Sequence, residues 1–291
     1  MPKTEKIEQN IALYRKYRPE TFEDVIGQDH IVKAIEGAFE SGKVAHAYLL
    51  SGPRGTGKTT IARIIARTLG SSVNDIYEMD AASNRKIEDA RDIRESVRTM
   101  PFDSKYKVYI LDEVHMLTKE AWNALLKTIE EPPAHVIFIL ATTELEKVPE
   151  TIVSRCQTFV FKKPTDAILA EVITRVAKKE GYTLAEGGAE LIALLASGAF
   201  RDALGTLQKV ISYSKDKKIT LKEIESVTGA PEASLVHSFL DALASSDIEK
   251  GYTAIRTASE QDMEMLIFLK MILAKLRYAL MLRYAPDSTT Y

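Results

Sequence analysis

One stretch constrains this chain more than any other, because it fits the pattern G-x-x-x-x-G-K-[ST] of a phosphate-binding loop: Gly52-Pro53-Arg54-Gly55-Thr56-Gly57-Lys58-Thr59. Its glycines let the backbone bend tightly and direct N–H groups at phosphate oxygens. Lys58 can reach the β- and γ-phosphates of a nucleotide, and the Thr59 hydroxyl suits Mg²⁺. The stretch therefore predicts a nucleotide site.

The residues on either side of this stretch support that interpretation. Ala47–Leu50 reads as a buried strand, and apolar residues recur at helical spacing downstream, at Ile61, Ile64, Ile65 and Leu69. A phosphate-binding loop requires this order of strand, loop and helix, because the helix N-terminus attracts anions. The flanking elements argue against the alternative of a simple glycine-rich turn.

A second strand ends in two acids. Four apolar residues, 108–111, run into Asp112 and Glu113, so the strand presents two carboxylates at its C-terminal end. In phosphate-loop ATPases such an Asp holds Mg²⁺, and the adjacent Glu can act as a general base on the attacking water. The second acid favours hydrolysis over phosphoryl transfer to a small molecule. We expect His115 to be a structural polar residue rather than a ligand.

Strand and helix patterns alternate through the first half of the chain. Further strands are predicted at 76–80, 136–140 and 158–161, and this alternation indicates a parallel α/β sheet with its ligand at the carboxyl ends of the strands. Thr143, at the end of one strand, can report on the γ-phosphate. Beyond Pro164 the strand signal stops, and helices at about 166–180, 189–197 and 201–214 predict a small all-α domain, with further helix from Gly229.

Composition sets limits on function. The chain has 291 residues, enough for about two domains, and 45% hydrophobic with 27% charged residues is typical of soluble proteins. A net charge of −2 means that any nucleic-acid contact must come from a local patch. One cysteine, Cys156, excludes an internal disulfide and a multi-cysteine zinc site. The start lacks a signal-peptide core, and the apolar stretch 263–284 is interrupted by four basic residues, so we expect a cytoplasmic protein without a membrane span.

Three features remain open from the residues alone. The basic segment before Pro19 is either irregular or part of an adenine pocket. The helix that begins near Arg85 carries basic residues among acids, so it is either a solvated face or a functional one. Arg201 at a helix N-terminus is either a surface residue or a functional one.

Five runs together resemble the AAA+ clamp-loader ATPases, in particular the gamma/tau family of bacterial DNA polymerase III. The resemblance extends over nearly the whole chain. The runs Asp112–Leu117 and Leu125–Pro133 look bacterial and less like the small subunits of replication factor C. The runs are Tyr17–Phe22, Asp80–Asn84, Asp112–Leu117, Leu125–Pro133 and Ser154–Cys156.

The resemblance implies a fold and its domains. It implies an AAA+ phosphate-loop NTPase domain with a parallel sheet over residues 1–163. A helical lid over 164–228 and the start of a helical collar over 229–291 would follow. The family usually carries a four-cysteine zinc module where this chain has only Gly70–Asp75, so no structural zinc is expected. Because the chain reaches only part-way into the collar, its assembly into a pentamer is left open.

The resemblance also implies residue roles. ATP would be bound by Gly52, Pro53, Arg54, Gly55, Thr56, Gly57, Lys58, Thr59, Thr60, Tyr14, Arg18, Val25 and Ile26. Mg²⁺ would be held by Thr59 and Asp112. The catalytic set would be Glu113 as base, Lys58, Thr143 as sensor 1, Arg201 as sensor 2 and Arg155 as an arginine finger for a neighbouring subunit's site. The DNA backbone would be contacted by Arg85, Lys86 and Arg91.

The implied function is ATP hydrolysis by a subunit that loads the sliding clamp onto primed DNA, within the DNA polymerase III nucleotidyltransferase. Implied partners are the delta and delta-prime subunits, further gamma/tau copies, the clamp and primed DNA, with no membrane. Two alternatives are a catalytically silent wedge subunit and another AAA+ DNA machine, such as a branch-migration motor. The intact Lys58, Thr59, Asp112 and Glu113 argue against the first, and the five runs argue against the second.

Overall fold

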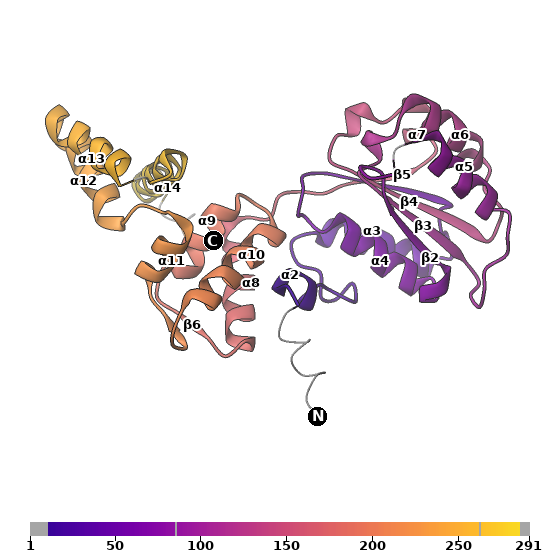
Figure 1. Ribbon diagram of the computed structural model, residues 1–291, viewed down its shortest axis with the longest axis horizontal. Coiled ribbons are helices and arrows are strands. Elements are labelled where there is room, and N and C mark those ends of the chain that lie inside the picture. Colours follow the sequence, from indigo (N-terminus) through magenta and orange to yellow (C-terminus); the bar gives the residue numbers. More distant parts are fainter. Residues whose placement is uncertain (1–10, 85, 262, 286–291) are drawn as a thin grey trace. The chain divides into compact units, whose positions relative to one another are not determined.

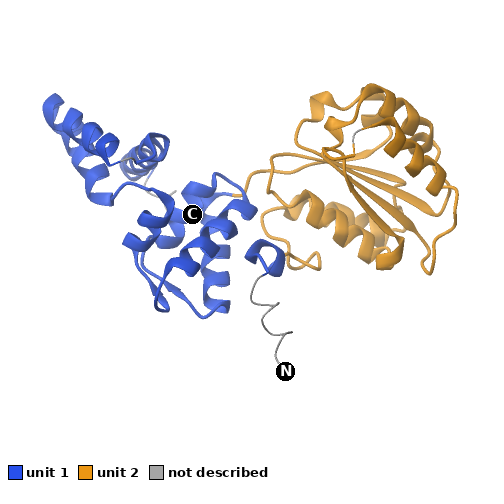
Figure 2. Ribbon diagram, viewed as in Figure 1, with its two compact units in different colours: residues 1–17, 165–291 blue, residues 18–164 orange. Residues whose placement is uncertain are grey.

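The computed structural model describes residues 11–84, 86–261 and 263–285 (Figure 1). The chain divides into two compact units (Figure 2). Residues 18–164 form the sheet unit, and residues 11–17 and 165–285 form the helical unit. Residues 11–17 group with the helices although they precede the sheet in sequence, and the predicted domain bounds, 1–163 for the first domain, stay a prediction.

The physical reason lies in α2 (Leu13–Lys16). The backbone N–H of Leu13 donates to Oε1 of Gln208 at 3.0 Å, and the Lys16 ammonium donates to Glu180 at 2.8 Å. The Tyr17 hydroxyl donates to the same Glu180 oxygen. These contacts attach the short helix to the helical unit, although it precedes the sheet in sequence.

The sheet unit is built on five parallel strands in the order β2-β3-β4-β1-β5. Figure 1 labels β2, β3, β4 and β5 of this sheet. Their bounds are β1 Ala47–Ser51, β2 Ile76–Asp80, β3 Lys107–Asp112, β4 Val136–Thr142 and β5 Gln157–Val160. The predicted parallel sheet is confirmed. Register pairs Ser51 with Thr142 and Asp80 with Asp112, so the C-terminal ends of β1, β4, β2 and β3 lie at one edge.

Helices cover both faces of this sheet, which explains its near-continuous apolar strands. One core contains Tyr48 and Leu50 with α3 (Asp29–Glu40) and α4 (Lys58–Thr68). The other contains Leu49 with residues of α5 (Ile87–Ser96), α6 (Lys119–Glu130) and α7 (Glu150–Val153). The alternation from 48 to 50 follows from the two-residue period of a strand. Short turns η1 (Val73–Asp75), η2 (Val114–Met116) and η3 (Leu145–Lys147) join these elements.

Asp75 closes the connection between α4 and β2. Its carboxylate is fully buried and accepts backbone N–H groups of Phe102 at 2.6 Å, Asp103 at 3.1 Å and Ser104 at 3.0 Å. The Ser104 hydroxyl in turn accepts the N–H of Ser72 at 2.7 Å. One carboxylate therefore joins the α4–β2 connection to the loop before β3.

The helical unit contains α8 (Asp166–Lys179), α9 (Gly188–Ala196), α10 (Phe200–Tyr213), α11 (Leu221–Thr228), α12 (Ala233–Ser245), α13 (Ile248–Glu260) and α14 (Met265–Tyr284). It is mostly rather than wholly helical, because β6 (Thr183–Leu184) and β7 (Lys218–Ile219) form a parallel pair. Two-residue strands are too short to show an alternating pattern. Among the described helices, none has the length and apolar character needed to cross a bilayer. The division into lid and collar stays a prediction.

Candidate active site

The phosphate-loop stretch joins β1 to α4, and the structure requires glycine at two of its positions. Gly52 has φ 146°, and a Cβ there would lie 2.6 Å from the carbonyl oxygen of Phe161 and 2.8 Å from its Cβ. Gly57 has φ 106°, which L side chains rarely adopt, and immediately precedes α4. Any side chain at either position would therefore distort the loop.

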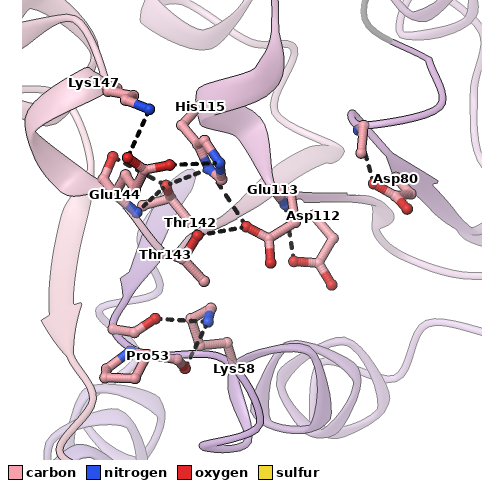
Figure 3. Close-up of polar contacts among 12 residues, drawn as sticks. Pro53, Lys58, Asp80, Asp112, Glu113, His115, Thr142, Thr143, Glu144 and Lys147 are labelled. Atoms are coloured by element: carbon pink, nitrogen blue, oxygen red, sulfur yellow. Dashed lines mark hydrogen bonds and ion pairs between the residues drawn. The ribbon is translucent and has the colours of Figure 1, made fainter.

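Lys58 and Thr59 begin α4. The Lys58 side chain is buried, and its ammonium donates to the carbonyl of Gly52 at 2.7 Å and of Pro53 at 3.0 Å (Figure 3). The Thr59 hydroxyl donates to Oδ2 of Asp112 at 2.6 Å. The first turn of α4 thus meets the end of β3.

These oxygens fit a magnesium site. Mg²⁺ in proteins is held by one or two oxygen side chains together with phosphate oxygens and water, rather than by a full protein cage. The Thr59 hydroxyl and Asp112 carboxylate form such a pair beside the phosphate loop. Within the described part of the chain no group of three or more His, Cys, Asp or Glu residues is arranged to hold a metal. The absence of structural zinc stays a prediction.

Glu113 follows β3 in an uncommon backbone conformation. Its φ of 49° lies in the left-handed region, which few non-glycine residues adopt and which clusters at functional sites. The Glu113 N–H donates to Oδ1 of Asp112 at 2.9 Å. The Thr143 hydroxyl, just after β4, donates to Oε2 of Glu113 at 3.0 Å (Figure 3). The two predicted site residues from β3 and β4 are therefore in contact.

His115 lies in the same cluster, with its side chain 7% exposed. Its Nδ1 is 3.1 Å from the Thr142 hydroxyl and 3.4 Å from Oε2 of Glu113, and its Nε2 is 3.2 Å from Oε1 of Glu144. A hydrogen bond from Lys147 lowers the pKa of Glu144. The sequence predicted only a structural role for His115, because Thr142 and Glu144 come from β4 and the segment that follows it.

Arg155 lies just after α7. Its guanidinium donates to the carbonyl of Thr151 at 2.7 Å and forms an ion pair with Glu130, the last residue of α6. Val25 and Ile26 are half-buried in the loop before α3. That loop is fixed by Gln28, whose amide donates to the Lys162 carbonyl at 2.7 Å.

Two predicted residues of the helical unit meet each other. The Arg201 guanidinium lies 5.8 Å from the centre of the Tyr14 ring, within the range of a cation–π contact. Their roles toward a nucleotide stay predictions. Lys86, just before α5, and Arg91, on α5, are exposed, whereas Arg85 lies outside the described residues.

The fold and the residue patterns have known counterparts. Residues 21–109 match the family described as magnesium chelatase, subunit ChlI, and residues 71–165 match the family described as DNA polymerase III, delta subunit. The structure resembles the Thermotoga maritima RuvB Holliday junction branch migration motor with a TM-score of 0.62 and 24% identity. The alignment covers 78% of this chain and 79% of that one. The chain has the AAA+ fold.

Curated relatives define the family. DNA polymerase III subunit gamma of Buchnera aphidicola is 42% identical over 249 residues, which cover 78% of this chain and 68% of the relative. Subunit tau of Bacillus subtilis is 39% identical over 296 residues, 94% of this chain and 52% of the relative. The gamma/tau subunit of Mycoplasma pneumoniae is 38% identical over 283 residues, which cover 90% of this chain and 42% of the relative.

The chain belongs to the family of DNA polymerase III gamma and tau subunits. The predicted resemblance is confirmed. The chain spans about half of the length of the Bacillus and Mycoplasma relatives.

Proposed function

We propose that this chain is an ATP-hydrolysing subunit of a clamp loader, which loads the sliding clamp onto primed DNA for DNA polymerase III in the cytoplasm. One observation carries the proposal. At the edge where β1, β3 and β4 end, the Thr59 hydroxyl touches the Asp112 carboxylate and the Thr143 hydroxyl touches the Glu113 carboxylate. Candidate metal-binding oxygens and a candidate base therefore lie together beside a phosphate loop.

The nucleotide would be held through its phosphates. Backbone N–H groups of Gly52–Thr60 and the Lys58 ammonium would contact them, and Thr59 with Asp112 would hold Mg²⁺. When bound there, Mg²⁺ would supply positive charge against the charge that develops on the phosphates. The adenine would lie against Tyr14, Arg18, Val25 and Ile26.

Glu113 would act on water. Its carboxylate takes a proton as the water oxygen bonds to the γ-phosphorus, and the bond to ADP breaks with its electron pair on the β-phosphate oxygen. Thr143 would hold the Glu113 carboxylate in place. Arg201 would stabilise the developing charge, and Arg155 would do so in a neighbouring subunit's site.

The remaining roles concern partners. We infer contacts with delta, delta-prime and further gamma/tau copies, with the sliding clamp and with primed DNA. The DNA backbone would face Arg85, Lys86 and Arg91, and phosphate contacts of this kind are independent of sequence.

The test is the ATPase rate of the assembled loader, with and without primed DNA and clamp. We expect stimulation by both. Glu113→Gln should still bind ATP but hydrolyse it about 10²–10⁴-fold more slowly, whereas Lys58→Ala should weaken ATP binding itself. An inactive parent would indicate a silent wedge subunit. Turnover that clamp and primed DNA leave unchanged would favour another AAA+ machine.

A further inference from the structure

Two side chains lie against one oxygen of the Glu113 carboxylate. The Thr143 hydroxyl donates to Oε2 at 3.0 Å, and Nδ1 of His115 lies 3.4 Å from the same oxygen (Figure 3). For Oε1 of Glu113 no partner is found within residues 11–84, 86–261 and 263–285. The carboxylate is thus anchored on one side and open on the other.

The His115 ring is itself fixed on both sides. Its Nε2 lies 3.2 Å from Oε1 of Glu144, whose other oxygen is paired with the Lys147 ammonium at 2.7 Å. Its Nδ1 lies 3.1 Å from the hydroxyl of Thr142, which is fully buried and also accepts the N–H of Glu144 at 3.0 Å. A nearly buried ring held at both nitrogens has little freedom to move.

We propose that His115 is a positioning residue for Glu113. Together with Thr143 it fixes Oε2, so that Oε1 is presented to the water that attacks the γ-phosphate. The inference rests on the proposed function, in which Glu113 is the base.

Glu113 needs such support for a structural reason. Its backbone is in the left-handed region at φ 49°, and its side chain has three rotatable torsions. A base must be held within hydrogen-bond reach of its proton, and a displacement of about 1 Å can cost about 10²-fold in rate. The His115 ring packed against Oε2 restricts the carboxylate more than the Thr143 hydrogen bond alone.

The alternative is that His115 only anchors η2 to the segment after β4 through Glu144. Two substitutions separate these roles, because each keeps one of the two ring nitrogens. In His115→Asn the amide nitrogen is bonded to Cγ, as Nδ1 is, so a nitrogen beside Thr142 and Glu113 is kept and the Glu144 contact is lost. In His115→Gln the amide nitrogen reaches the place of Nε2, so the Glu144 contact is kept instead.

The experiment measures kcat and KM for ATP in the assembled loader with primed DNA and clamp. We expect His115→Gln to lower kcat about 10- to 10²-fold with KM unchanged, and His115→Asn to keep most of the parental rate. As a control, measurements of ATP binding and thermal unfolding show whether each variant is folded and binds ATP.

The same substitutions in a Glu113→Gln background complete a double-mutant cycle. If His115 acts through Glu113, His115→Gln should slow the residual rate no further there. An equal loss of kcat in His115→Asn and His115→Gln would overturn this inference alone. So would an equal loss from His115→Gln in the parent and in the Glu113→Gln background. A parent that does not hydrolyse ATP, or a fully active Glu113→Gln variant, would overturn the proposed function and this inference with it.

Discussion

Replacing Asp75 by Asn should destabilise the sheet unit while leaving side-chain volume nearly unchanged. Oδ1 of Asp75 accepts the N–H of Phe102 at 2.6 Å, and Oδ2 accepts those of Asp103 at 3.1 Å and Ser104 at 3.0 Å. An Asn amide has a single acceptor oxygen, so its NH₂ group must face at least one of these donors. The substitution removes both a hydrogen bond and the charge of the acceptor.

The magnitude follows from the contacts. Leaving one buried donor unsatisfied costs about 1–3 kcal/mol. Each hydrogen bond that remains changes from a charged to a neutral acceptor and weakens by about 1 kcal/mol. Since two hydrogen bonds remain, we expect a loss of about 3–5 kcal/mol in the free energy of unfolding at neutral pH, a large part of a typical domain's stability.

The loss should depend on pH. Burial of Asp75 by itself would raise its pKa, but the hydrogen bonds from Phe102, Asp103 and Ser104 outweigh burial and hold the pKa below its usual range. A depressed folded-state pKa stabilises the fold above the unfolded pKa of about 3.9, and this stabilisation is lost as pH falls toward the folded value. The difference between parent and Asp75→Asn should be constant from about pH 5 to 8 and shrink below about pH 4.

The assay is urea unfolding followed by tryptophan fluorescence. The chain has one tryptophan, and Trp122 is buried on α6, so its emission reports on the sheet unit. Asp92→Asn, an equal charge change at an exposed position of α5, is the matched control. A loss below about 1 kcal/mol that does not vary with pH would refute this account of the Asp75 contacts.

The remaining predictions concern the site. Gly52→Ala should abolish ATP binding, measured by titration calorimetry, because the new Cβ would lie 2.6 Å from a backbone oxygen just after β5; unimpaired binding would refute the close approach. A loader reconstituted from Arg155→Ala and Glu113→Gln subunits should exceed either single-variant loader in ATPase rate if the arginine acts in trans, and equal rates would reject that role. Lys86→Ala with Arg91→Ala should flatten the salt dependence of binding to primed DNA, and an unchanged slope would leave the helix a solvated face.

Much of the site was predictable because its signals are local. The phosphate loop and the acids at 112 and 113 lie in short runs whose chemistry depends on adjacent residues. The apolar strands also carry a pattern that predicts parallel pairing, and the end of each strand then falls at one edge of the sheet. The five runs that resemble the clamp-loader ATPases predicted the family without a structure.

Other contacts required the tertiary structure. His115 lies two residues beyond Glu113, but the η2 turn and the register that pairs Leu111 with Leu140 bring it to Glu144. The pairing of Arg155 with Glu130 likewise joins two segments that no local pattern connects. Periodicity reports which residues are buried, not which partners they meet.

The sequence by itself determined that a phosphate loop, a carboxylate pair and a helical region follow one another in this chain. Only the tertiary structure decided that α2 packs with the helices and that His115 reaches the candidate base. The physical reason is that hydrogen-bond partners are selected by three-dimensional packing between elements distant in sequence, whereas propensity and motif chemistry act over a few residues.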